Sequence, residues 1–279
     1  MAELTKLVDG AINIVLAKFS HIQLRPEEIA VSLAVLGSDG SASSAHYRGD
    51  EPIYPASVIK LFYLVAAHRW MEDGIVADTA ELRRALRDMV VDSGNEATGY
   101  VVDVLTNTTS GPELSDAALE EWHENRNSVN RFFHGLGYNE INANRKTWHD
   151  GPYGRDKQAV DRFVPARNSL TTNATARLLV EIANGRCVSE RRSQEMLELM
   201  KRDFTNPESQ DCQATDFFGP GLPVTAKLWS KAGYMSKARH DAAIVRLADN
   251  RQFVLVAFTI RPDNQEIIPE VARQIIAGL

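Results

Sequence analysis

The chain has 279 residues, of which 44% are hydrophobic, and this is enough to bury a sizeable core in one large domain or two intimate subdomains. The formal net charge is −6 with both signs dispersed, which excludes the basic stripe of a nucleic-acid-binding protein. The apolar stretches are shorter than the roughly 20 residues of a membrane span, and residues 1–10 show no basic segment followed by an apolar run. We therefore expect a soluble, cytoplasmic protein, unless a leader has been removed, with a small-molecule substrate and no nucleic-acid or membrane partner.

The N-terminal part of the sequence predicts a helix followed by a β-hairpin. Residues 3–19 carry apolar side chains at helical spacing. The apolar run Ile29–Leu36 is typical of a strand, and Ser38–Gly40 supplies a turn before a second strand near Ser43–Arg48. A long, mainly helical region then extends from about residue 57 to about residue 182.

Ser57 and Lys60 begin this helical region, and the lysine is out of place there. Residues 61–67 are apolar nearly all round, as in a buried helix. A cation in the first turn faces the positive end of the helix dipole, and its burial is costly. Burial, the helix terminus or a second cation would lower the pKa of Lys60. A neutral lysine can take a proton from the hydroxyl of Ser57 on the same helical face, which makes Ser57 a candidate nucleophile.

A plainer interpretation of the same two residues stays open. Ser57 can cap the helix, and the Lys60 side chain can extend along the helix to solvent. A Ser-x-x-Lys match often arises by chance, so the pattern needs support from elsewhere in the chain.

A short polar segment, Ser93-Gly94-Asn95, stands between two predicted helices at residues 80–91 and 96–105. In the functional interpretation Ser93 relays protons, and the amide of Asn95 contacts both the lysine and the substrate. In the alternative, the segment is an interhelical turn in which Asn95 caps the second helix.

Signals for β-strands return near the C-terminus. Residues 224–230 are one candidate strand, and residues 241–248 and 252–260 flank a hairpin turn at Asp249–Arg251. Residues 265–277 close the chain as a helix with one apolar face.

Lys231-Ala232-Gly233 stands at the end of the first of these strands. Gly233 would let a ligand approach the backbone closely. Lys231 would attract a substrate carboxylate and lower the pKa of Lys60 through its charge. The alternative is a surface lysine at a strand end.

These elements predict an α/β (α+β) fold in a single domain over residues 1–279. An antiparallel sheet flanked by the N- and C-terminal helices would form one half, at approximately residues 1–54 and 221–279. An inserted all-helical half would span approximately residues 55–220.

The polar motifs together resemble the class A β-lactamase and penicillin-binding-protein superfamily, whose signature is Ser-x-x-Lys, Ser-Asp-Asn and Lys-Thr-Gly. Their order and spacing match across nearly the whole chain. The resemblance implies a β-lactamase/transpeptidase-like fold, an acyl-enzyme on Ser57, and an oxyanion hole from the backbone amides of Ser57 and Tyr234. The motifs stand here as Ser57-Val58-Ile59-Lys60, Ser93-Gly94-Asn95 and Lys231-Ala232-Gly233.

Two departures from the family pattern concern substrate binding. Gly94 replaces the acid of the second motif, whose serine and asparagine remain. Ala232 replaces a hydroxyl residue that helps to bind the β-lactam carboxylate, which removes a hydrogen bond of roughly 0.5–1.5 kcal/mol. Ser236 or Arg239 could substitute for it, or the substrate could lack that carboxylate.

A third departure concerns the glutamate that activates the deacylating water in class A enzymes, because no Glu-x-x-Leu-Asn motif occurs here. One alignment places Asp161–Asn168 on the corresponding loop, with Val164 at the glutamate position. Another places Lys146–Asp150 there, with His149 or Asp150 nearby. A valine cannot activate water, whereas a histidine can, since its pKa lies near neutrality. The alternative for His149 is a loop residue without a catalytic role.

The sequence therefore predicts a serine hydrolase acting on an amide, lactam or ester, with slow β-lactam turnover. Penicillin-binding-protein-like or esterase activity and a non-catalytic binding module on the same fold are the alternatives. The aromatic side chains of Trp148, Tyr153 and Tyr234 could line the pocket. No metal or organic cofactor is indicated, since Cys187 and Cys212 lack metal-ligand spacing; they can form one disulfide or remain free thiols.

Overall fold

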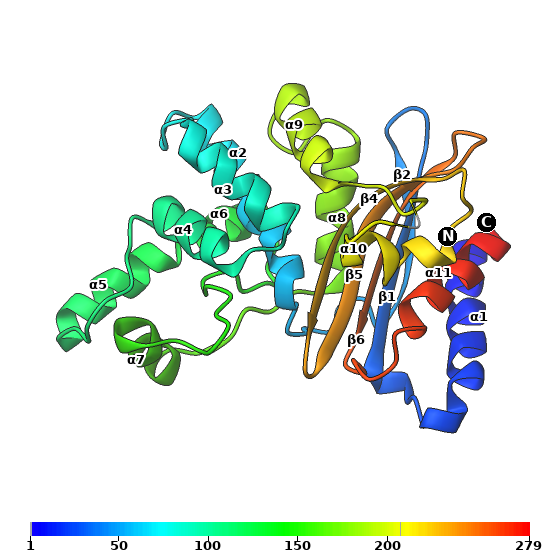
Figure 1. The fold of residues 1–279 in the computed structure, drawn as a ribbon, viewed down its shortest axis with the longest axis horizontal. Coiled ribbons are helices and arrows are strands. Elements are labelled where there is room, and N and C mark those ends of the chain that lie inside the picture. The colour runs from blue at the N-terminus through cyan, green and yellow to red at the C-terminus, as the bar shows by residue number, and fades with distance from the viewer. Residues whose placement is uncertain (1, 207) are drawn as a thin grey trace. The chain divides into compact units, whose positions relative to one another are not determined.

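A computed structural model describes residues 2–206 and 208–279, and within these ranges the chain divides into two compact units. The sheet unit joins Met1–Val58 to Thr171–Leu279. The helical unit is the inserted segment Ile59–Leu170. Figure 1 shows the strands of the sheet unit lying side by side with helices on their faces.

Among the described residues, six strands form one antiparallel sheet in the order β2-β1-β6-β5-β4-β3. Strands from both ends of the chain therefore meet at its centre, where β1 pairs with β6. The bounds are β1 (Ile29–Leu36), β2 (Ala42–Tyr47), β3 (Lys201–Arg202), β4 (Lys227–Met235), β5 (Ala238–Arg246) and β6 (Gln252–Thr259).

The terminal helices cover one face of this sheet, as Figure 1 shows for α1 and α11. The two helices are α1 (Ala2–Lys18) and α11 (Ile267–Gly278). Alternate residues of the strands point to this face, as the pleat of a strand requires, and they form the main core with the apolar sides of both helices. The predicted antiparallel sheet flanked by terminal helices is confirmed.

The opposite face of the sheet is covered by α8 (Thr172–Ala183), which is followed by α9 (Glu190–Met200). The Ser32 hydroxyl of β1 lies 2.7 Å from the Thr172 hydroxyl at the start of α8. Because this helix packs on the sheet, the sheet unit resumes at Thr171, whereas the sequence placed the second boundary near residue 220. Burial on both faces also explains why β1 is apolar at every position except Ser32.

The helical unit is built around α2 (Lys60–Glu72), which is buried along nearly its whole length. Its other helices include α3 (Ala80–Val90) and α4 (Asn95–Thr106), which flank the segment Asp92–Gly94. The unit continues through α5 (Asp116–Arg126), α6 (Ser128–Gly135) and α7 (Gly154–Arg162). Within the described ranges, no helix combines the length and apolar character that crossing a bilayer requires.

Candidate active site

Lys60 is the first residue of α2, and its side chain is 0% exposed. Its Nζ donates hydrogen bonds to the carbonyl oxygen of Ser93 at 2.6 Å, to the hydroxyl of Ser93 at 3.2 Å, and to Oδ1 of Asn95 at 3.0 Å. The helical unit thus brings together the lysine of the first sequence motif and both polar side chains of the second. The interpretation in which this lysine reaches solvent is wrong.

A tight turn between α3 and α4 presents Ser93 and Asn95 to this lysine. Ser93 adopts a left-handed conformation with φ +56°, which is uncommon for a residue with a side chain. The Gly94 amide donates to the Asp88 carbonyl at 2.9 Å, and Gly94 caps α4. Asn95 therefore begins α4 rather than capping it, which leaves its side chain to accept from the lysine.

Burial lowers the pKa of Lys60 from its ordinary 10.5 to about 7, and the negative charge of Glu96 opposes this shift. Burial is one of the three causes that the sequence suggested, and it is the largest contribution to the shift. Since the pKa lies near neutrality, a substantial fraction of this amine is uncharged at pH 7. An uncharged amine can accept a proton.

Ser57 lies in the sheet unit, in the 3-10 turn Ala56–Ile59 that leads into α2, and is half-buried. The preceding Ala56 has a left-handed φ of +46°. Strand β4 passes so close that a side chain at Gly233 would begin 2.7 Å from the carbonyl oxygen of Pro55 and 2.9 Å from the amide nitrogen of Ser57. Glycine is therefore required at position 233, because only hydrogen fits between the two backbones.

Strand β4 runs from Lys227 to Met235, so Lys231-Ala232-Gly233 lies inside the strand. The expectation that this motif ends the strand is wrong. Pairing continues through Gly233, which lies opposite His240 of β5. A lysine and a glycine suggested that the strand ends here, but pairing with β5 continues the strand through the motif. The motif is therefore part of the sheet.

Lys231 is 0% exposed, which excludes the surface lysine of the alternative interpretation. Its Nζ donates to Oε1 of Gln213 and, at 2.8 Å, to the carbonyl oxygen of Ala232. Oε1 of Gln213 also accepts from the Ala232 amide at 3.2 Å. Gln213 belongs to the short helix α10 (Cys212–Thr215) and was not predicted, since so short a polar helix has no apolar periodicity to mark it.

The remaining predicted binding residues differ in burial. Tyr234 is 59% exposed, and Ser236 is exposed in the turn between β4 and β5. Arg239 is buried; it donates to the carbonyl oxygen of Asp216 at 2.7 Å, and its guanidinium carbon lies 4.3 Å from the ring centre of Phe217. This arginine is therefore held by a hydrogen bond and by a cation–π contact.

The candidate deacylation loop is closed at its ends by the antiparallel bridge between Asn142 and Ser169. Asn168 is buried beside it; its Oδ1 accepts from the amide of Arg145 at 2.9 Å, and its Nδ2 donates to the Arg145 carbonyl oxygen at 2.9 Å. The hydroxyl of Tyr63 in α2 donates to that same carbonyl oxygen at 2.6 Å. Asn168 thus ties the loop to the helical core.

The other residues proposed for this loop are exposed: Val164 is 94% exposed, and His149 and Asp150 also face solvent. The aromatic Tyr153 is 75% exposed, whereas Trp148 is half-buried. The loop therefore offers a buried amide at Asn168 and exposed titratable groups at positions 149 and 150.

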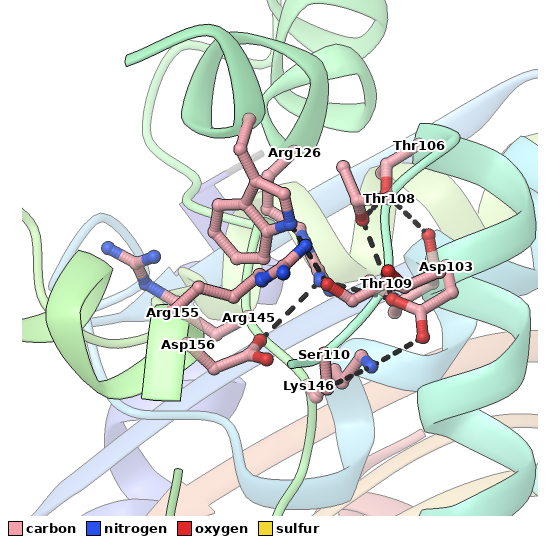
Figure 2. A network of polar contacts seen from close by, with 12 residues as sticks. Asp103, Thr106, Thr108, Thr109, Ser110, Arg126, Arg145, Lys146, Arg155 and Asp156 are labelled. Atoms are coloured by element: carbon pink, nitrogen blue, oxygen red, sulfur yellow. Dashed lines mark hydrogen bonds and ion pairs between the residues drawn. The ribbon is translucent and has the colours of Figure 1, made fainter. Parts of the chain in front are cut away.

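A buried ion-pair network holds the start of this loop, as Figure 2 shows. Asp103 of α4 accepts from Lys146 Nζ at 2.6 Å and from Arg126 Nη2 at 3.1 Å, and Arg126 Nη2 lies 3.5 Å from Asp156 of α7. The Arg126 side chain is 1% exposed. Breaking a buried ion pair by removing one partner typically costs about 3–5 kcal/mol, so this network fixes the loop firmly to the helices around it.

Cys187 and Cys212, both in the described part of the chain, are free thiols. Burial raises the pKa of the Cys187 thiol to about 12, so this side chain is a poor nucleophile.

Solved structures with the same fold cover almost the whole chain. A β-lactamase from Sphaerobacter thermophilus DSM 20745 is 16% identical, with a TM-score of 0.67 over 96% of both chains. A mutant of PBP-A in an acyl-enzyme complex with penicillin G is 20% identical, with a TM-score of 0.67 over 98% of this chain and 96% of that chain. A β-lactamase from Chitinophaga pinensis DSM 2588 is 18% identical, with a TM-score of 0.64 over 96% of this chain and 97% of that chain. No curated protein matches the sequence.

These structural likenesses establish the β-lactamase fold, in agreement with the resemblance inferred from the three motifs. The sequence match to a known family begins at residue 17 and runs to residue 279, so it includes the serine, the lysines and every other residue of the predicted site. The chain belongs to the Beta-lactamase enzyme family.

Proposed function

We propose that this protein is a serine hydrolase that forms an acyl-enzyme on Ser57 with an amide, lactam or ester substrate. Neutral Lys60 accepts the proton of the Ser57 hydroxyl as Oγ attacks the substrate carbonyl carbon. The amides of Ser57 and Tyr234 donate to the resulting oxyanion. The proton then passes through Ser93 to the leaving nitrogen or oxygen as its bond to carbon breaks, which leaves an ester on Ser57.

The observation that carries this proposal is the buried amine of Lys60 between Ser93 and Asn95, with its pKa lowered to about 7. A lysine that served only packing would gain nothing from this position, because burying its charge is costly. Perturbed pKa values of this kind cluster at functional sites.

The other site residues have supporting roles in the proposal. Lys231 supplies a positive charge at β4 that attracts an anionic substrate, and Asn95 donates its amide to the substrate. Gly233 keeps the strand close to the Ser57 turn. Arg239 or Ser236 binds a substrate carboxylate in place of the hydroxyl that is missing at position 232.

Slow release of the acyl group is the second part of the proposal. The sequence has no Glu-x-x-Leu-Asn motif, and the loop of residues 143–168 carries Val164, which has no ionisable group, while His149 and Asp150 are exposed. Without a positioned base, water attacks the ester slowly. A long-lived adduct, as in a penicillin-binding protein, is therefore favoured over rapid β-lactam turnover.

Intact-protein mass spectrometry after incubation with penicillin G and a panel of small esters tests this proposal. We expect the mass to rise by the whole mass of penicillin, because opening the lactam ring expels no leaving group, and to fall back slowly. An ester should instead add only its acyl part. Absence of any adduct with penicillin, the esters and a fluorophosphonate probe would contradict the proposed serine hydrolase. The non-catalytic binding module on the same fold would then be the remaining interpretation.

The rate of adduct formation should depend on pH through Lys60. Its pKa of about 7 means that protonation removes the base as the pH falls, so the rate should drop about tenfold per pH unit below 7 and level off above it. The second-order rate constant for labelling by a fluorescent penicillin, measured from pH 5 to pH 9, gives this profile. A flat profile across that range would show that Lys60 is not the base.

A further inference from the structure

His240 occupies a position in β5 that faces the turn carrying Ser57 from within the sheet unit. It pairs with Gly233 of β4, the residue whose backbone lies against that turn. Its side chain is 0% exposed. Nothing in the sequence singles out this histidine, which stands between Arg239 and Asp241 and belongs to none of the three motifs.

The hydrogen bonds of His240 define where its ring proton lies. Its Nδ1 lies 3.2 Å from the backbone nitrogen of Thr259 in β6, which is a donor, so Nδ1 is unprotonated. The neutral ring then carries its proton on Nε2. Burial lowers the pKa of His240 to about 4, so the ring stays neutral at physiological pH.

Nε2 donates its proton to the carbonyl oxygen of Tyr54 at 2.9 Å. Tyr54 precedes Pro55, and a residue before proline is restricted to an extended conformation. This restriction limits the directions in which the Tyr54 carbonyl group can point. The Pro55 carbonyl oxygen in turn accepts from the Val58 amide at 3.1 Å, which closes the turn around Ser57. His240 therefore holds the residue at which this turn begins.

We propose that His240 is a positioning residue for Ser57. Its bond to Tyr54 and the close packing of Gly233 hold the turn of residues 54–58 from the same pair of strands. Together they fix the direction of the Ser57 hydroxyl and amide. This inference rests on the proposed role of Ser57 as the nucleophile, and it adds a residue that never touches the substrate.

Two substitutions separate the two bonds of the ring. In His240→Gln, the side-chain amide nitrogen takes the place of Nε2 and keeps the donor for Tyr54. In His240→Asn, the shorter side chain places its oxygen where Nδ1 was and keeps the acceptor for Thr259, but it does not reach Tyr54. Each variant loses one hydrogen bond, so their free energies of unfolding should fall by similar amounts.

We expect His240→Asn to lower the second-order rate constant for labelling of Ser57 by a fluorescent penicillin by about 10- to 100-fold, since small misplacements of a nucleophile are costly. His240→Gln should label within about threefold of the wild type by the same reasoning. Urea unfolding of each variant gives the folded fraction by which the rates are corrected. Equal labelling of the two variants per folded molecule would overturn the proposal.

Hydrogen exchange of the Val58 amide, followed by mass spectrometry of peptides from this turn, tests the same proposal without catalysis. Exchange should be faster in His240→Asn than in the wild type and unchanged in His240→Gln. If the wild type is not labelled at Ser57, the proposed function fails, whereas unchanged exchange in His240→Asn would refute the positioning role itself.

Discussion

Ser57→Ala is expected to abolish the covalent adduct with penicillin and with esters, while non-covalent binding persists. Alanine removes the attacking oxygen, and no neighbouring group replaces it in the mechanism above. The oxyanion donors are backbone amides, and alanine keeps them. Intact-mass spectrometry shows the loss of the adduct, and ligand-induced change in melting temperature shows the binding that remains.

Ser38→Ala is the matched control, because Ser38 is an exposed serine in the turn between β1 and β2. It should label like the wild type. An adduct of unchanged mass in the Ser57→Ala variant would place the nucleophile elsewhere in the chain.

Lys60→Met is expected to lower the labelling rate by about 10²–10⁴-fold, as removal of a general base commonly does, and at the same time to stabilise the fold. The wild-type lysine has a pKa lowered from 10.5 to about 7, so the folded state disfavours its charged form by about 5 kcal/mol. Methionine has a similar length and no charge, but it leaves the oxygens of Ser93 and Asn95 with one partner fewer, which costs about 1–3 kcal/mol. The net gain in unfolding free energy at pH 6 should be about 2–4 kcal/mol.

The pH dependence of this gain identifies its cause. The unfolded lysine binds its proton below pH 10.5 and the folded one only below about pH 7, so the unfolded state holds more protons between these values. The stability advantage of methionine should therefore be complete below pH 7 and shrink as the pH rises toward 10.5. Urea unfolding at pH 6 and pH 9 measures it, with Lys6→Met at an exposed position of α1 as control. If the Lys60→Met variant is less stable than the wild type at pH 6, burial of the charged lysine does not destabilise the folded state as proposed.

The fold could be predicted largely from patterns of apolar residues. The run Ile29–Leu36 has the bounds of β1, because a strand buried on both faces is apolar at nearly every position, here at all but Ser32. The boundary between the helical unit and the returning sheet unit, at Thr171, could not be found in this way. The amphipathic pattern of α8 is the same whether the helix packs on other helices or on a sheet, and only the contacts with β1 and β6 decide between them.

The site could be predicted in part, because Lys60 breaks a local rule by standing in an apolar helix. Its partners follow within 35 residues and belong to a recognisable motif. Gln213 and His240 break no such rule. The Tyr54 carbonyl that His240 contacts is 186 residues away in sequence, and a backbone group carries no sequence signal of its own.

The anchoring of the loop by Arg126 also determines how it responds to its surroundings. Dissolved ions screen exposed charges within about 10 Å at 0.1 M, but they screen buried pairs much less. Arg126 and Asp156 are 1% and 3% exposed, so raising the ionic strength leaves their attraction nearly intact. We therefore expect the conformation of the loop around Asp156 to depend little on the salt concentration.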